Sequence, residues 1–396
     1  MVMKKTREGT CSAEVLPTVV VIYCPLWHSY DLQSAWKGEG WCEWELLKSA
    51  PARFHGHHQP LQPTWGYFDE SDPRWAAKEI DLAADHGIGV FLFDWYWYSG
   101  VKIMEAALER GFLEARNRMR LRFALMWANH DWADIFPAPY GKPWHCLLPS
   151  RHSARDLNRL MDYCAEHYFC QPNYWRLDGK LFFSVFLPMR LVEQLGGPAK
   201  TKRSLQAIDR RLRAARLPPI HWNAMTGSAK ELPVLKQAGF GTTTTYNLTG
   251  SGKVGPKDGP IEQYTDFMDA HRRHWSAMGS TTLPHLPVVT MGWDVSPRCQ
   301  RDVPWPPAAP KGAKDRPYPY MHVVVGNTPE RFEQLCREAR RHVNPDCHRD
   351  TGPKVVVVNA WNEWTEGCYL LPEKKYGDAY LRALRRAFST APAVRR

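Results

Sequence analysis

Short apolar runs alternate with helical stretches from one end of the 396-residue chain to the other. Eight strand-like runs, several of them continuously apolar, predict strands at 19–25, 90–97, 123–128, 181–187, 220–224, 242–246, 287–291 and 355–359. Helices are predicted between and after them, at 72–87, 103–116, 154–166, 205–216, 229–238, 260–278, 329–342 and 376–388. Asp178-Gly179 is a hairpin turn signal that leads into the fourth strand.

Several of the predicted strands are continuous apolar runs with no alternation of polar residues. Such runs are typical of parallel strands whose two faces are both covered by helices. Together with the repeated strand–helix order, they predict an α/β fold, a (β/α)8 TIM barrel. No linker or break in composition divides the chain, so we expect a single catalytic domain over 19–388, an N-terminal extension over 1–18 and a C-terminal tail over 389–396.

Composition narrows the classes of protein. No apolar run reaches the length of about 18 residues that a membrane span needs, so no membrane partner is predicted. The ten cysteines never form C-x-x-C, and no signal peptide is evident, which together favour a cytoplasmic location. The net charge of +11 admits an anionic partner, but the basic residues are scattered over predicted helices and favour solvated helix faces over nucleic acid. The oligomeric state stays open.

Polar residues follow the predicted strands at the end where barrel enzymes place their chemistry. The sharpest group is Glu363 and Glu366, which come directly after the last strand. If the chain turns there, both carboxyl groups share one face, and an aromatic cleft can keep one protonated while the other is ionised. Glycoside hydrolysis needs such a pair. The alternative is that one of the two glutamates forms a structural ion pair with an arginine.

Two aromatic runs, 93–98 and 127–132, end predicted strands and set aspartates beside flat rings, which is typical of sugar-binding surfaces. Packing beneath the loops is the alternative. The histidine-rich segment 53–60 lacks acidic partners at metal-binding spacing, so it is expected to contact substrate or to be structural. Gly250 to Gly255 matches G-x-G-x-x-G, but prolines follow where a helix should begin, and a flexible loop is predicted. No metal or organic cofactor is predicted.

Five motifs occur in order along the chain: Gly40-Trp41-Cys42-Glu43-Trp44, Gly56-His57-His58-Gln59-Pro60, Trp127-Ala128-Asn129, Gly292-Trp293-Asp294 with Gly326-Asn327-Thr328-Pro329, and Asn359-Ala360-Trp361-Asn362-Glu363-Trp364 with Glu366-Gly367. With them the chain resembles the glycoside hydrolase family 99-like (WbsX-like) proteins over about 19–388. The resemblance implies a (β/α)8 barrel and, from family 99 proper, a retaining endo-α-mannosidase. It also implies that Glu363 acts as base on the sugar 2-hydroxyl and Glu366 as general acid.

The resemblance leaves an alternative, because WbsX-like proteins are also linked with polysaccharide biosynthesis, which implies transferase activity. The chain also departs from the family's W-A-N-E-N-W pattern by carrying His130 and Asp131, and it has Asp94 within an aromatic run. These departures bear on the identity of the sugar.

The sequence therefore predicts a glycoside hydrolase for α-linked, mannoside- or rhamnoside-like glycosides, with an oligosaccharide or polysaccharide as its partner. Glu363 and Glu366 are the predicted catalytic residues. The predicted substrate-binding residues are Glu43, Trp44, His57, Gln59, Asp94, Trp95, Trp97, Trp127, Asn129, His130, Asp131, Trp293, Asp294, Asn362 and Trp364. The other candidates are a glycosyltransferase-like enzyme, a non-catalytic sugar-binding barrel, and a binder of anionic glycans or nucleic acid.

Overall fold

A computed structural model describes residues 15–251, 261–279, 282–305, 307, 317–344 and 352–389. Most of the predicted N-terminal extension and C-terminal tail lie outside the described residues, as does most of the 250–255 segment.

The predicted barrel is confirmed. Its parallel strands are β1 (Thr18–Tyr23), β2 (Val90–Tyr98), β4 (Arg122–Trp127), β8 (Lys180–Val185), β9 (Ile220–Met225), β10 (Thr242–Thr244), β12 (His285–Leu286), β13 (Val288–Thr290) and β15 (Val355–Asn359). The first and last of them pair, with Val20 opposite Val357. The barrel closes through β12, which pairs with β10, and β13, which pairs with β15. Only Pro287 separates these two short strands, so they fill one predicted strand position.

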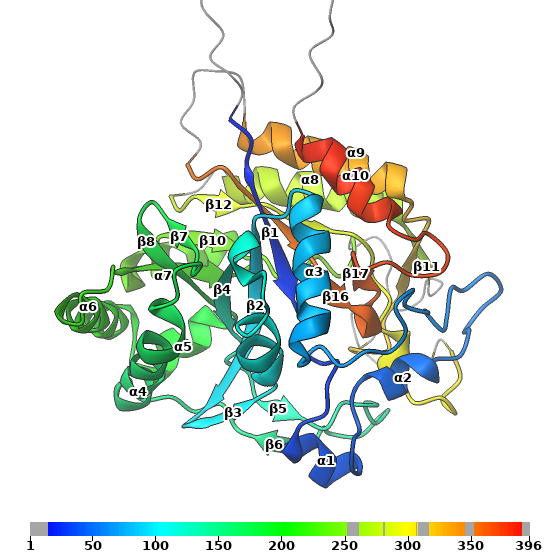
Figure 1. Cartoon of the computed structure of the whole chain (residues 1–396), viewed down its shortest axis with the longest axis horizontal. Helices are drawn as coiled ribbons and strands as arrows, with labels where there is room; N and C mark the ends of the chain where they lie inside the picture. The colour runs from blue at the N-terminus through cyan, green and yellow to red at the C-terminus, as the bar shows by residue number, and fades with distance from the viewer. Residues whose placement is uncertain are drawn as a thin grey trace, which may run out of the picture.

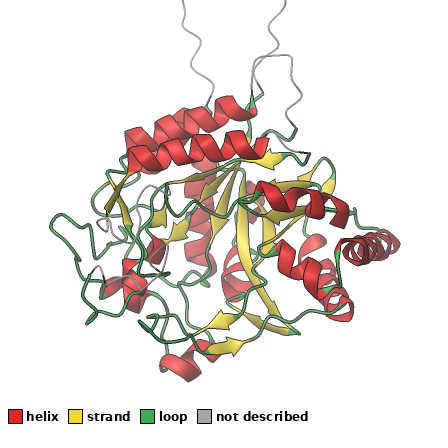
Figure 2. Cartoon of the chain, turned by 180° about the vertical axis from the view of Figure 1, so that it is seen from behind, coloured by secondary structure: helices red, strands yellow, loops and turns green. Residues whose placement is uncertain are grey.

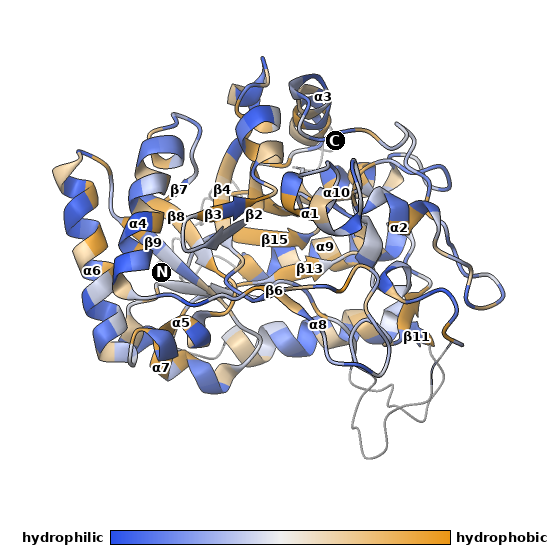
Figure 3. Ribbon diagram, turned by 90° about the horizontal axis from the view of Figure 1, so that it is seen from below, coloured by the Kyte–Doolittle hydropathy of each residue, from blue (hydrophilic) through white to orange (hydrophobic). Residues whose placement is uncertain are grey.

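Helices surround the barrel (Figures 1 and 2). The described helices are α1 (Asp31–Lys37), α2 (Trp44–Lys48), α3 (Pro73–Asp85), α4 (Ala154–Cys164), α5 (Pro188–Gln194), α6 (Pro198–Ala214), α7 (Leu232–Ala238), α8 (Tyr264–Gly279), α9 (Pro329–Val343) and α10 (Ala379–Phe388). In Figure 3 apolar colour gathers on the central strands, and polar colour lies on the helices around them. This distribution is the one expected of strands buried on both faces.

The helix predicted over 205–216 begins earlier, as α6 at Pro198, and two other predicted helices differ because a short strand replaces their first residues. The stretch predicted over 103–116 forms only a π-helix, Ala107–Phe112, because β3 (Val101–Ile103) turns back to pair with β2. The helix predicted over 260–278 begins only at Tyr264, since β11 (Ile261–Gln263) pairs with β14 (Val323–Val325). The Asp178-Gly179 turn is confirmed: both residues have positive φ, and they join β7 (Arg176–Leu177) to β8.

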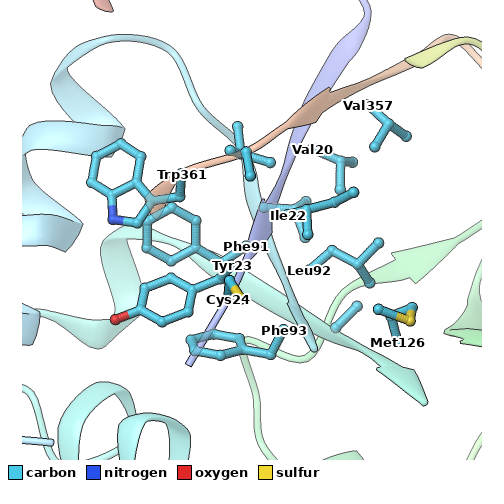
Figure 4. Close-up of a cluster of buried hydrophobic side chains, with 14 of the residues drawn as sticks. Val20, Ile22, Tyr23, Cys24, Phe91, Leu92, Phe93, Met126, Val357 and Trp361 are labelled. Atoms are coloured by element: carbon cyan, nitrogen blue, oxygen red, sulfur yellow. The ribbon is translucent and has the colours of Figure 1, made fainter. Parts of the chain in front are cut away.

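Side chains alternate between the two faces of the barrel strands. In Figure 4, Phe91 and Trp361 point to one side and Leu92 and Val357 to the other. The indole of Trp361 donates to Glu79 of α3 at 2.9 Å, which identifies the first side as the helix-covered exterior. Because the period along a strand is two, position 94 faces the barrel interior with position 92, and positions 95 and 97 face the helices.

Candidate active site

A cavity of about 610 Å³ opens at the carboxyl ends of the strands. Six of the predicted site residues line it: Asp94, His130, Asp131, Trp293, Glu363 and Glu366. Tyr96, Trp132, Phe136, Trp144 and Phe186 contribute aromatic surface to the same cavity. The volume lies in the range of sites for small ligands, and the combination of rings with a few polar groups is typical of them.

Glu363 and Glu366 reach the cavity through a tight turn that follows β15. The chain forms β16 (Asn362–Glu363), a 3-10 turn (Trp364–Glu366), and β17 (Cys368–Tyr369), which pairs back with β16. Gly367 adopts a φ of +68°, and the backbone N–H of Asp294 donates to the carbonyl of Glu366 at 2.7 Å. The turn expected from the spacing therefore exists and brings both carboxyl groups to one cavity.

Arg298 lies among these acidic side chains. Its Nη1 is 2.5 Å from Oε1 of Glu366, and its Nη2 is 3.4 Å from Oε1 of Glu363 and 3.3 Å from Oε2 of Glu43. Glu43 itself is fixed by a hydrogen bond from Thr365. Both glutamates thus contact an arginine, as in the structural alternative, but they do so inside the cavity and not away from it.

The buried acids do not ionise alike. Burial, and next the charge of Glu363, raise the pKa of Glu366 to about 8 despite its contact with Arg298. Burial also raises the pKa of Glu363, against the opposing charge of Arg298. Burial and the charge of Glu363 raise the pKa of Asp94 well above its usual value. At neutral pH Glu366 therefore keeps its proton beside Glu363, whose ionised form the charge of Arg298 favours, and acid–base catalysis uses such a pair.

Two tyrosines complete the site. The hydroxyl of Tyr246 lies 2.6 Å from Oε2 of Glu363 and 2.8 Å from Oδ2 of Asp94. The hydroxyl of Tyr318 donates to Oε1 of Glu366 at 2.9 Å. Tyr318 belongs to the described end of the proline-rich segment 304–319, so this segment contributes to the site although much of it lies outside the described residues.

Three predicted sugar-binding tryptophans lie away from the cavity, because they occupy outward positions of their strands. Trp95 donates its indole N–H to the hydroxyl of Tyr168. The indole nitrogen of Trp97 lies 3.4 Å from Oδ1 of Asp156, and the ring of Trp127 packs against that of His152. They are buried between the barrel and its helices. None of the three lines the cavity, and their contacts are those of the packing alternative.

Five further predicted residues form a layer behind the cavity. Asn129 exchanges two hydrogen bonds with the backbone of Leu187. The other four support the turn or its surroundings: Glu43 through Arg298, Trp44 and Trp364 by ring packing, and Asn362 by accepting from the N–H of Cys24. None of the five is among the side chains that line the cavity, so their contact with sugar is not supported.

His57, Gln59 and Asp294 lie in a neighbouring cavity of about 210 Å³, which shares Trp293 with the first. Nε2 of His57 is 2.8 Å from Oδ2 of Asp294, and the amide of Gln59 donates to the same oxygen at 2.7 Å. Burial would raise the pKa of Asp294, but these hydrogen bonds and His57 hold it below its usual value. The group therefore holds an ionised aspartate next to the turn that carries Glu366.

The two residues that depart from the family pattern line the cavity. Oδ1 of Asp131 accepts from the backbone N–H of Ser150 and from Arg190, both at 2.7 Å. Burial lowers the pKa of His130, so its imidazole is neutral at neutral pH. Its ring stacks with Trp132 and meets Tyr96 edge-on. The polar groups at this part of the cavity are thus a neutral imidazole and a paired carboxylate.

Sequence reasoning missed Arg298, Tyr246 and Tyr318. The rule that polar residues after barrel strands carry chemistry would have identified Tyr246, which comes just after β10. Arg298 lies in a short 3-10 turn after β13. No motif around it in the sequence indicates that it contacts three glutamates. Tyr318 lies 20 residues further on, in a loop.

Within the described ranges, no group of three or more His, Cys, Asp or Glu side chains could hold a metal ion. A search of the described helices found none with the length and apolar character needed to span a membrane.

Comparison with known proteins gives a family and a fold. A family model described as Glycosyltransferase WbsX matches residues 19–304 and 313–384. The chain is 28% identical over 400 residues to a protein of Xanthomonas campestris pv. campestris (strain B100) named Uncharacterized protein WxcX. The aligned region covers 97% of this chain and 52% of that protein. The chain therefore spans about half the length of the curated relatives it matches.

Two solved structures share the barrel. The GH99 endo-alpha-mannosidase from Bacteroides thetaiotaomicron matches with a TM-score of 0.54 and 15% identity, covering 93% of this chain and 96% of that one. A protein described as Glycoside hydrolase-like protein matches with a TM-score of 0.59 and 15% identity, covering 96% and 95%. At this level of identity the likeness concerns the fold alone.

Proposed function

The chain belongs to the Glycosyltransferase WbsX family, and on this premise we propose that its large cavity is the active site of a retaining glycoside hydrolase for α-linked glycosides. Mannoside- or rhamnoside-like oligosaccharides and polysaccharides are the proposed substrates. The observation that carries the proposal is the arrangement of Glu363, Glu366 and Asp94, three buried carboxyl groups on one aromatic cavity with different pKa shifts.

In the proposed first step, Glu363 takes the proton of the sugar 2-hydroxyl, and O2 attacks C1 to form a 1,2-anhydro sugar. The glycosidic C1–O bond breaks, and Glu366 gives its proton to the departing oxygen. The raised pKa of Glu366, about 8, keeps that proton available at neutral pH. In the second step Glu366 takes a proton from water, the water oxygen attacks C1 as the C1–O2 bond breaks, and Glu363 returns its proton to O2.

The family description also supports transfer to a sugar acceptor as a second candidate. Transfer uses the same first step, and a sugar hydroxyl then replaces water as the attacking group. The likeness to a GH99 endo-alpha-mannosidase fold does not distinguish the two, because both reactions need a proton donor and a base at the same positions.

The test is turnover of a panel of α-mannosides and α-rhamnosides, with products followed by NMR in the presence and absence of acceptor sugars. We expect Glu366→Gln to lower kcat/KM by about 100- to 10,000-fold, because removal of a general acid has that cost. Free reducing sugar of retained configuration indicates the hydrolase, and a new glycoside only with acceptor present indicates the transferase.

Glu45→Gln is the matched control, since Glu45 is an exposed carboxylate of α2 that pairs with Lys48. It is expected to leave kcat/KM as in the unaltered enzyme. Full activity of the Glu366→Gln variant would refute the acid assignment. Binding of oligosaccharides without any turnover would instead favour a sugar-binding barrel.

A further inference from the structure

Tyr246 bridges two carboxyl groups with a single hydroxyl. Its oxygen lies 2.8 Å from Oδ2 of Asp94 and 2.6 Å from Oε2 of Glu363, and both distances are those of hydrogen bonds. A tyrosine hydroxyl has one hydrogen, so it can donate to only one of the two acids. The other short contact needs a hydrogen supplied by the carboxyl group itself. One of the two acids must therefore be protonated.

The surroundings differ between the two acids. Glu363 has Nη2 of Arg298 at 3.4 Å from its second oxygen, Oε1. Among the described residues, no cation pairs directly with Asp94, and its second oxygen, Oδ1, is buried without a hydrogen-bond partner. An ionised carboxylate left with an unpaired buried oxygen is costly, whereas a neutral carboxyl group tolerates it better. The proton therefore belongs to Asp94 and the charge to Glu363.

We propose that Asp94 works in its protonated form as the positioning residue for Glu363. Its hydroxyl donates to the oxygen of Tyr246, which turns the tyrosine hydrogen towards Glu363 and keeps that side chain ionised. The inference rests on the proposed function, because it gives Glu363 the ionised state that a base needs.

The electrostatics agree with this geometry. Burial and the charge of Glu363 together raise the pKa of Asp94 well above its usual value. The hydrogen bond with Tyr246 lowers the pKa of both acids, but the charge of Arg298 is the largest influence that opposes burial at Glu363 and only a minor one at Asp94. The charge is therefore favoured on Glu363, the acid next to the cation.

The first test compares Asp94→Val with Asp94→Asn. Valine keeps the approximate shape of aspartate but cannot donate to Tyr246, and we expect kcat/KM to fall about 10- to 100-fold. Asparagine can replace a protonated carboxyl group, since its amide donates and its carbonyl accepts. We expect Asp94→Asn to recover at least about tenfold of that loss. Equal loss in both variants, or no loss in the valine variant, would overturn the proposal.

The pH dependence of kcat/KM separates the proposed role of Asp94 from a purely structural one. If Asp94 is neutral, the acidic limb of kcat/KM stays in place in Asp94→Asn. If Asp94 is ionised, the amide removes a negative charge beside Glu363 and the limb moves to lower pH, which contradicts the proposal. Tyr246→Phe should move the limb to higher pH, because Glu363 loses a donor.

An infrared difference spectrum tests the protonation state without any substrate. At neutral pH, the spectrum of the unaltered protein minus that of Asp94→Asn is expected to contain the carbonyl band of a protonated carboxyl group. Loss of a carboxylate band instead would overturn the proposal. This measurement still decides the state of Asp94 if no glycoside in the panel is turned over, so failure of the proposed function is recognised separately.

Discussion

At the scale of single residues, the protein places several carboxyl groups where burial dominates their ionisation. Glu79 is the clearest example outside the cavity. It lies on α3 and points towards the outer face of the barrel strands. There it accepts hydrogen bonds from the hydroxyl of Tyr23 at 3.1 Å and from the indole of Trp361 at 2.9 Å. Burial, and next the charge of Glu70, raise the pKa of Glu79 to about 8. The folded protein therefore keeps a proton that the unfolded chain releases at lower pH.

This difference sets the sign of a stability change. Between the unfolded pKa of 4.5 and about 8 the folded state binds more protons, so the free energy of unfolding falls as pH rises through that window. Glutamine cannot ionise and can make the same two contacts. We expect Glu79→Gln to be the more stable protein at pH 8 and to gain relative to the unaltered protein across the window, by at most about 5 kcal/mol.

Urea unfolding at a series of pH values measures this difference. Glu114→Gln serves as the control, because Glu114 is exposed, and it should follow the pH dependence of the unaltered protein. A Glu79→Gln curve parallel to that of the unaltered protein would show that Glu79 is ionised in the fold.

At the scale of elements, the strands are predictable from the sequence, and so are the directions of their side chains. The barrel strands lie at the predicted positions, and most of them coincide with apolar runs, because a parallel strand buried on both faces leaves a continuous signal. The period of two along a strand separates Asp94 and Tyr96 from Trp95 and Trp97 by position alone. The stretch 103–116 could not be assigned in this way, since its β3 segment depends on pairing with β2.

Site residues that directly follow a strand were predictable from the sequence. Site residues that reach the cavity from long connections were not. Glu363 and Glu366 sit next to β15, so their shared cavity follows from the barrel itself. Arg298 and Tyr318 both contact Glu366 from the long connection between β13 and β14. Their positions depend on tertiary contacts that no local pattern in the sequence encodes.

The turn that carries Glu366 depends on Gly367. Its φ of +68° is strained for other residues, and a Cβ there would lie 2.8 Å from the backbone nitrogen of Asp294. That nitrogen donates to the carbonyl of Glu366, so relief of the clash would shift the catalytic turn. We expect Gly367→Ala to lower stability by about 1–3 kcal/mol and to lower kcat/KM in the protein that remains folded.

Gly66→Ala is the matched control for backbone strain. Gly66 has a similar φ of +74°, but a Cβ there would meet no atom within 4 Å. It should lose stability through strain alone and keep its kcat/KM. Thermal unfolding and kinetics of both variants check the prediction, and equal activity in the two would mean that the turn at 367 tolerates displacement.

At the scale of the whole molecule, strands from the N-terminal and C-terminal parts of the described chain pair with each other. β1 lies between β2 and β15, so the first strand is hydrogen-bonded to strands from both ends of the chain. The last helix, α10, packs on α9. A barrel joined in this way cannot lose one end without exposing the strands of the other, which supports the prediction of a single domain over 19–388.

Leu384→Ala tests that prediction from a position on α10 away from the cavity. Leu384 is fully buried, and its truncation should cost about 2–5 kcal/mol through lost burial and the cavity left behind. If the barrel is one cooperative unit, near-ultraviolet and far-ultraviolet circular dichroism should report one transition, displaced by the same amount to lower temperature. Arg385→Ala, an exposed neighbour on the same helix, should leave the transition in place. Separate transitions from the two probes would instead mean that α10 and its neighbours unfold independently of β2, which carries Asp94, and β10, which Tyr246 follows.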